Sequence, residues 1–169
     1  MQMNSSQNYV RAGDGPDYFS WSLLLFTSLA GLLASIWPMP IWAVWIRPEF
    51  AAMLVIYWVL FAPFRVGMLY GWSMGFMLDL LMGTALCQHA LGLTIVAYVI
   101  FLVHQRLRMF AIPQQAIAVF VIVSLYQLVN YWMLGFSGGG YASFALILPA
   151  LASAICWPFT RLLLDRLRM

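Results

Sequence analysis

Few residues in this sequence could do chemistry, and the most notable of them is the carboxylate of Asp79. It is the only charge in the apolar run VGMLYGWSMGFMLDLLMG, residues 66–83. The polar residues Gln88 and His89 follow it, and Gln127 and Asn130 lie in a later apolar segment. A carboxylate among apolar residues is tolerated only where it faces protein or trapped water. The pattern predicts either a proton or cation site or an interhelical hydrogen-bond network. The partners of Asp79 would then include His89, Gln88 or Asn130.

The other candidates for catalysis or metal binding fail on composition or spacing. We expect no second membrane carboxylate on another helix, which argues against an ion-coupled carrier. Gly135-Phe136-Ser137-Gly138 matches the GxSG motif of rhomboid proteases, but no histidine base follows His104. His89 and His104 would lie about 22 Å apart on one helix, too far to share an iron. Cys87 and Cys156 are expected about 20 Å apart in depth, beyond disulfide reach. We therefore predict no enzyme, metal, cofactor or disulfide.

Glycines recur every fourth residue around Asp79, at Gly67, Gly71, Gly75 and Gly83. In water such a helix would be poor, because each glycine costs about 0.5–1 kcal/mol relative to alanine. In a membrane the missing side chains let a neighbouring helix approach closely. Each step of four residues turns about 40° further around the helix axis. Gly71, Gly75 and Asp79 can therefore share one face, whereas Gly67 and Gly83 serve the helix ends. The run predicts a helix-packing element, facing either its own bundle or a second protein.

The composition indicates an integral membrane protein. Of 169 residues, 64% are hydrophobic and only 8% are charged, whereas soluble domains carry about 25% charged residues. Apolar runs occupy the whole sequence, so no separate soluble catalytic domain is expected. The net charge of +3 comes from arginines between the apolar runs, and this placement excludes a nucleic-acid-binding patch.

Six apolar segments are long enough to cross a bilayer, which predicts an all-α fold with six transmembrane helices. A cytoplasmic tail would cover residues 1–17, and a single membrane domain would cover 18–169. Because the first apolar stretch is about 20 residues long, it is a first span and not a cleaved signal peptide. The predicted spans are 18–37, 49–64, 66–82, 85–103, 116–136 and 141–164.

The arginines predict the orientation. With the N-terminus inside, seven arginines fall in cytoplasmic segments and Arg47 alone falls outside, so both termini are expected in the cytoplasm. Asp79, Gln88, His89 and Asn130 would then lie at one level in the outer third of the membrane. Such a layer is either a shallow outward cavity or a set of groups that satisfy one another. The basic segment 104–108 is either a topology signal or a docking point for acidic lipid or a cytoplasmic partner.

Four short motifs occur in a specific order between residues 48 and 108. They are Tyr57-Trp58, Pro63-Phe64-Arg65-Val66-Gly67, the segment from Gly75 to Gly83, and Gln88-His89-Ala90-Leu91. In this order they resemble the MreD family of bacterial rod-shape-determining membrane proteins. The length and the number of predicted spans agree with that family. One departure is Cys87, where the family often has glycine.

The resemblance implies a non-enzymatic member of the cell-elongation machinery in the bacterial inner membrane. Family members bind the bitopic protein MreC and act with MreB, RodA and its class B penicillin-binding partner in lateral peptidoglycan synthesis. The implied fold is similar to the S-components of energy-coupling-factor transporters. A solute-binding subunit of that type is the alternative function. The family's structural candidates in this sequence are Arg65, Gly67, Gly75, Asp79 and His89.

Overall fold

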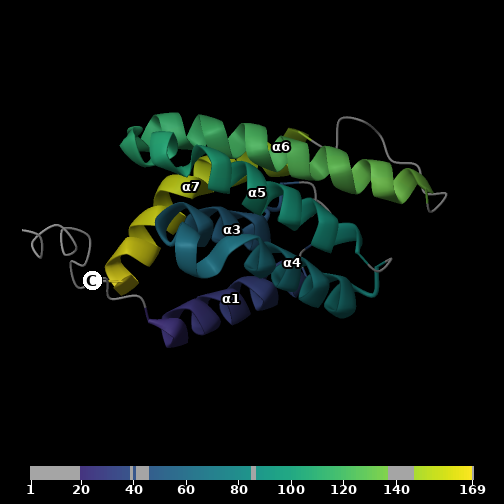
Figure 1. Ribbon diagram of the computed structural model, residues 1–169. Helices are drawn as coiled ribbons and strands as arrows, with labels where there is room; N and C mark the ends of the chain where they lie inside the picture. The colour runs from purple at the N-terminus through teal and green to yellow at the C-terminus, as the bar shows by residue number, and fades with distance from the viewer. Residues whose placement is uncertain (1–19, 39, 41–45, 85–86, 137–146, 169) are drawn as a thin grey trace, which may run out of the picture.

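The structure is a computed structural model that describes residues 20–38, 40, 46–84, 87–136 and 147–168. The described residues form six α-helices, and each of them overlaps one of the six segments predicted as spans (Figure 1). The predicted tail and the ends of several predicted spans lie outside the described residues. The helices are α1 (Trp21–Ile36), α3 (Phe50–Phe61), α4 (Pro63–Met82), α5 (Gln88–Met109), α6 (Ile112–Phe136) and α7 (Ile147–Arg168).

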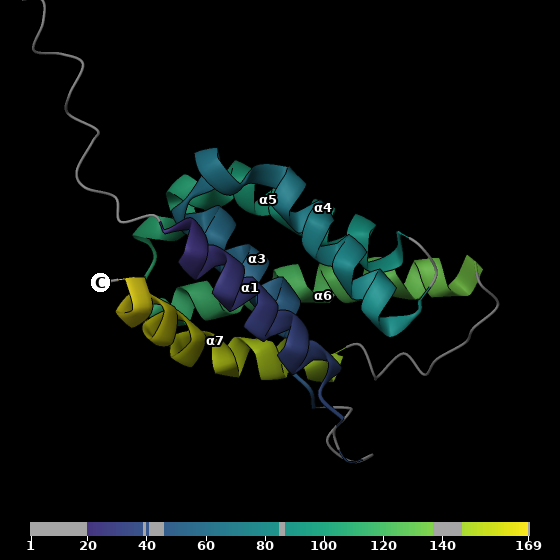
Figure 2. The ribbon, with the colours of Figure 1, turned by 90° about the horizontal axis from the view of Figure 1, so that it is seen from below.

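Helix α3 forms the centre of the bundle. Every residue from Ala51 to Leu60 is buried, because α1, α4, α5, α6 and α7 all pack against this helix. A helix that is apolar on all sides is stable only in such an enclosed position. In Figure 2, α1 crosses in front of α3, with α4 and α7 on its two sides. Two hydrogen bonds tie α1 to its neighbours: Trp58 Nε1 donates to Thr27 Oγ1, and Ser28 pairs with the Tyr70 hydroxyl.

Helix lengths and exposed side chains agree with a membrane protein. Helices α5, α6 and α7 are long and apolar enough to cross a bilayer, whereas α1 and α3 are shorter apolar helices. Helix α4 is not among these three, because its glycines, Arg65 and Asp79 lower its hydropathy. Large apolar side chains such as Phe26 and Leu25 are about two-thirds exposed, and an apolar surface of this extent suits contact with lipid.

Helix α4 begins and ends at residues with special backbone conformations. Pro63 occupies its first turn, where a missing N–H costs nothing. Gly67 interrupts the helix with φ 44° and ψ −165°, and Gly83 ends it with φ 64°. A Cβ atom at either glycine would have no neighbour within 4 Å. Both glycines thus lie toward the ends of α4, and no neighbouring helix in the described residues packs against either of them. Their absent side chains permit a left-handed backbone.

The other two glycines of the series pack directly against α5. A Cβ atom at Gly71 would lie 2.6 Å from the Leu93 carbonyl oxygen. At Gly75 it would lie 2.6 Å from both the Ala90 nitrogen and the His89 carbonyl oxygen. The two backbones approach so closely that no side chain fits between them, which is the packing that small residues allow in membrane helices. Gly71 and Gly75 thus lie against the chain's own bundle.

We expect Gly75→Ala to destabilise the protein, because the new methyl group meets backbone atoms that cannot move aside. Overpacking of this kind costs about 1–3 kcal/mol. The measurement is the midpoint of thermal unfolding in detergent. Gly135→Ala in α6 is the matched control, since a Cβ there meets nothing within 4 Å. That change should leave stability unchanged or raise it by up to about 1 kcal/mol. Equal effects of the two substitutions would contradict the packing argument.

Candidate functional site

Polar side chains from five helices meet in one layer of the bundle, which we call the polar belt. Its first contact joins Asp79 on α4 to His89 on α5. The centroid of the His89 ring lies 6.3 Å from the centroid of the Tyr126 ring on α6. The next residue, Gln127, donates to Glu49 Oε1 at the start of α3, over 2.7 Å. The belt ends on α7, where the Ser153 hydroxyl accepts the Glu49 N–H. Its members are Asp79, His89, Tyr126, Gln127, Glu49 and Ser153.

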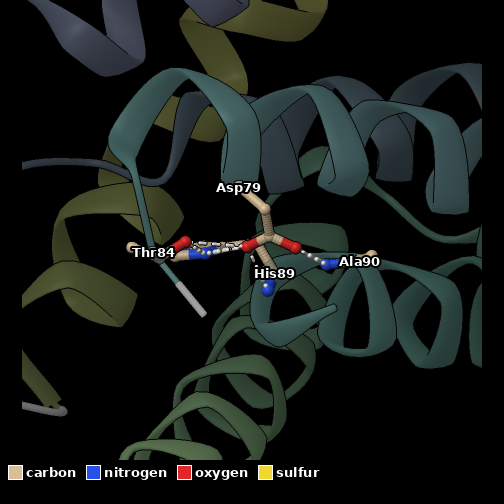
Figure 3. A network of polar contacts seen from close by, with 4 residues as sticks. All are labelled: Asp79, Thr84, His89 and Ala90. Carbon is tan, nitrogen blue, oxygen red and sulfur yellow. Dashed lines mark hydrogen bonds and ion pairs between the residues drawn. The ribbon is translucent and has the colours of Figure 1, made fainter. Parts of the chain in front are cut away.

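The Asp79 carboxylate is buried and accepts four hydrogen bonds (Figure 3). Its Oδ1 atom accepts from the Thr84 hydroxyl at 2.9 Å, the His89 N–H at 2.9 Å and His89 Nδ1 at 2.8 Å. Its Oδ2 atom accepts from the Ala90 N–H at 3.2 Å. All donors come from the turn after α4 and the first turn of α5. The carboxylate therefore fixes this junction.

Asp79 supplies the N-terminal cap that α5 lacks in its own sequence. The first N–H groups of any helix have no partner inside the helix. Cys87, at the N-cap position, provides no side-chain hydrogen bond, so the His89 and Ala90 N–H groups donate to Asp79 instead. The negative charge also lies at the positive end of the α5 dipole. The Asp79 carbonyl meanwhile accepts the Gly83 and Thr84 N–H groups that end α4. One residue thus ends one helix and caps the next.

Cys87 adopts a left-handed conformation with φ 74°, and it is the one non-glycine residue with positive φ in the described chain. L-amino acids with a Cβ atom adopt this conformation at a cost of about 1–2 kcal/mol. The family resemblance led us to expect glycine at this position. The geometry gives the physical reason, since glycine has no such cost. Cys87 and Cys156 are both free.

Three members of the polar belt, Glu49, Tyr126 and Ser153, were not predicted from the sequence, and Glu49 is the acid among them. It lies at the N-cap of α3, about 18 Å along that helix from Phe61, and binds Gln127 and Ser153. The expectation of no second membrane carboxylate on another helix was therefore wrong. An acid following Pro48 at the start of an apolar helix marks an N-cap position in the sequence, although the Glu49 side chain makes no cap hydrogen bond here. Because α3 is so short, that cap lies among the other helices.

The structure does not join all of the predicted network residues. Arg65 is exposed and lies about 21 Å along α4 from Asp79, so it belongs to the opposite end of the bundle. Gln88 begins α5, and no hydrogen bond joins its side chain to the belt within the described residues. Asn130 lies beside Gly92 and Tyr126. Its side chain interacts with the Tyr126 hydroxyl, and both groups are buried. Ser137 of the GxSG motif lies outside the described residues.

The geometry around Asp79 suits a fixed anion better than a catalytic acid or base. Two of its four donors are backbone N–H groups that cannot turn away. His89 donates from Nδ1 to this carboxylate, as a histidine does when its ring is held in one orientation. The expected partner His89 is thus found, and the structural interpretation of the network is favoured over a proton or cation site.

A comparison with known protein families shows which family the chain belongs to. The sequence profile of the family described as rod shape-determining protein MreD matches residues 17–167. The chain belongs to the MreD family. Among curated proteins it is similar to the rod shape-determining protein MreD of Haemophilus influenzae, with 26% identity over 148 residues. The alignment covers 88% of this chain and 91% of that protein.

Membership of the MreD family confirms the resemblance inferred from the motifs around Asp79. The family's description names a role in rod-shape determination and no reaction. The Asp79–His89 pair of this MreD-family chain lies within the matched residues. No solved structure matches the chain, so the expected similarity to S-components stays a prediction.

We expect Asp79→Asn to lower stability by at least about 2 kcal/mol, since hydrogen bonds to a charged group contribute about 1.5–3 kcal/mol each. The new amide can keep an oxygen toward Thr84 and His89, but its NH2 group then faces the Ala90 N–H. Thr84→Val removes only one of the four bonds and should cost about 1.5 kcal/mol, the lower end of that range. Thermal unfolding in detergent measures both. An Asp79→Asn protein as stable as the wild type would exclude the capping role.

Cys87→Gly should stabilise the protein by about 1 kcal/mol, because it removes a strained left-handed residue. Cys87→Ser is the matched control, since serine removes the thiol but keeps the Cβ atom and the strain. Its unfolding midpoint should match that of the wild type. A rise of equal size in both variants would show that the thiol, and not the backbone, is responsible.

Proposed function

We propose that this chain is a non-enzymatic membrane scaffold of the bacterial cell-elongation machinery. It would cross the inner membrane six times, as one domain from residue 18 onward, with both termini in the cytoplasm. It would bind MreC and support lateral peptidoglycan synthesis and rod shape. MreB, RodA and the class B penicillin-binding partner of RodA would join it in a larger complex. Family membership supports the role in rod shape.

The distribution of arginines supports the orientation. Arg65, Arg106, Arg108, Arg166 and Arg168 lie near the start of α4 or the ends of α5 and α7, and Arg161 lies beside Phe61. These helix ends meet at one end of the bundle, which we call the arginine end. Arg47 lies at the other end, where it donates to the Ala34 carbonyl near the end of α1. An excess of positive charge marks the cytoplasmic side of membrane proteins.

A lateral groove is the observation that carries the proposed binding of MreC. It is a cavity of about 440 Å³ whose walls are α1 and α7 and whose floor is α3. The α1 wall consists of small residues, Ala30, Gly31 and Ala34, and the rims carry Phe26 and Phe159. The lining is almost wholly apolar. The groove opens on the side of the bundle, where lipid or another helix would lie.

A single transmembrane helix is the occupant that suits this groove. Helices associate in lipid mainly by close packing, and small residues such as those of α1 permit that approach. A bitopic protein such as MreC offers one helix of that kind. The groove also gives access to α3, the helix to which the other five are packed, so an occupant would contact the centre of the fold. Binding there could stabilise one arrangement of the bundle.

We expect a photoreactive phenylalanine derivative at Phe26 or Phe159 to crosslink to MreC in cells. Both side chains line the groove and are about two-thirds or more exposed. Tyr98 on α5 is the matched control, because it is aromatic and exposed but does not line the groove. Immunoblotting for MreC after irradiation is the measurement.

Three results would contradict this assignment. Tyr98 could capture MreC as strongly as the groove positions do. The groove positions could capture only a second copy of this chain. The purified protein could also carry a vitamin-like small molecule, visible by mass spectrometry, with no MreC present. That last outcome would favour the solute-binding alternative.

A further inference from the structure

Three guanidinium groups surround one aromatic ring at the arginine end. The Cζ atoms of Arg108, Arg161 and Arg168 lie 5.7, 5.6 and 5.8 Å from the centroid of the Phe61 ring. Arginines within about 6 Å of a ring are held by cation–π attraction. They come from α5 and α7 and converge on the last residue of α3. The ring holds together three like charges that would otherwise repel one another.

Next to this ring lies a pocket of about 150 Å³. Its wall contains Arg65, Arg108 and Arg168, together with Phe61 and the first residues of α4. Arg161 does not line it, and the charge of Arg161 is offset by Asp165 at 3.6 Å. Within the described residues, no ion pair joins Arg108 or Arg168 to a carboxylate. Arg168 contacts the Tyr57 hydroxyl, which donates to Asp165, so Arg108 and Arg168 together bring more positive charge to this pocket than the one nearby carboxylate offsets.

Apolar side chains border the same pocket on its outer side. Phe64 is part of the pocket wall and is 87% exposed, and Phe61 and Pro63 line the pocket beside it. Free inorganic phosphate would use only the arginines. A membrane lipid would use both features, since its phosphate would meet the arginines and its acyl chains would lie on the apolar side chains. Lysine and arginine pockets near the ends of transmembrane helices bind anionic headgroups in this way.

We propose that this pocket binds the phosphate headgroup of an anionic membrane lipid. Arg108 and Arg168 would hold the phosphate, with Arg65 at the rim. Guanidinium groups form paired, charge-assisted hydrogen bonds with phosphate oxygens, and the flat fork of arginine fits them better than lysine does. The bound lipid would join the ends of α4, α5 and α7. This site is independent of the groove and of whichever partner occupies it.

The test uses the full chain, purified in detergent, with phosphatidylglycerol as the probe. Phosphatidylcholine and inorganic phosphate are the comparison ligands. Native mass spectrometry measures retained lipid, and thermal unfolding measures stabilisation. We expect retention of phosphatidylglycerol and a raised unfolding midpoint, with little effect of the other two. The double variant Arg108→Gln with Arg168→Gln should bind phosphatidylglycerol about tenfold or more weakly, as loss of charge-assisted bonds predicts.

The chain offers a closely matched control. Arg106 and Arg166 lie on the same two helices, are exposed and do not line the pocket. The pair Arg106→Gln with Arg166→Gln removes the same charge and should bind like the wild type. Replacing Arg108 and Arg168 with lysine keeps the charge but removes the forks, so its binding should be intermediate. Circular dichroism verifies that each variant is folded.

Four outcomes would overturn the proposal. The two glutamine pairs could weaken binding equally, which would indicate diffuse attraction to the whole arginine end. Phosphatidylcholine could bind as well as phosphatidylglycerol. Inorganic phosphate could stabilise the protein as strongly as the lipid does, which would make this a free-anion site. An oligoglutamate peptide could displace the lipid at a lower concentration than inorganic phosphate, which would indicate a protein segment as the natural occupant.

Discussion

The junction between α4 and α5 depends on one carboxylate. Asp79 accepts two N–H groups from the first turn of α5, one side-chain hydroxyl and one imidazole N–H. In the low dielectric of a bundle interior these bonds are strong, and a group left unpaired there would be costly. The carboxylate also permits the close approach at Gly75, because it holds the start of α5 against the bare face of α4. Without this acid, the first N–H groups of α5 would lack an acceptor. Helix α5 would also no longer be held at a fixed position along α4.

The other helices pack around the fixed pair of α4 and α5. Helix α3 packs against both α4 and α5, and its short length leaves Glu49 among the other helices, where Gln127 and Ser153 bind it. The polar belt is therefore largely satisfied by its own members. The surfaces left for other molecules lie elsewhere, in the apolar groove between α1 and α7 and in the basic pocket beside Phe61. This division agrees better with a scaffold than with a protein that binds solute at the level of Asp79.

The packing of α4 against α5 and the main partner of Asp79 could be predicted from individual residues. The glycine spacing predicted close packing at Gly71 and Gly75, and the stranded acid predicted a partner such as His89. Family membership followed from the motifs around Asp79. The residues that could not be placed from the sequence are those whose role depends on backbone angles or on the length of a helix. The rotation of the helix already assigned Gly67 and Gly83 to the helix ends, but it could not predict their positive φ. Glu49 was overlooked because the short length of α3 is not evident from hydropathy.

The sequence by itself determined that the chain is helical, apolar and suited to a membrane, because composition and periodicity are local properties of the chain. It also determined the family. Only the tertiary structure decided which polar groups meet, since contacts such as Gln127 with Glu49 join residues 78 positions apart. It also brought Arg108 and Arg168 to the same phenylalanine ring. Such pairings depend on how helices cross and where each one ends, and no local pattern encodes either of these.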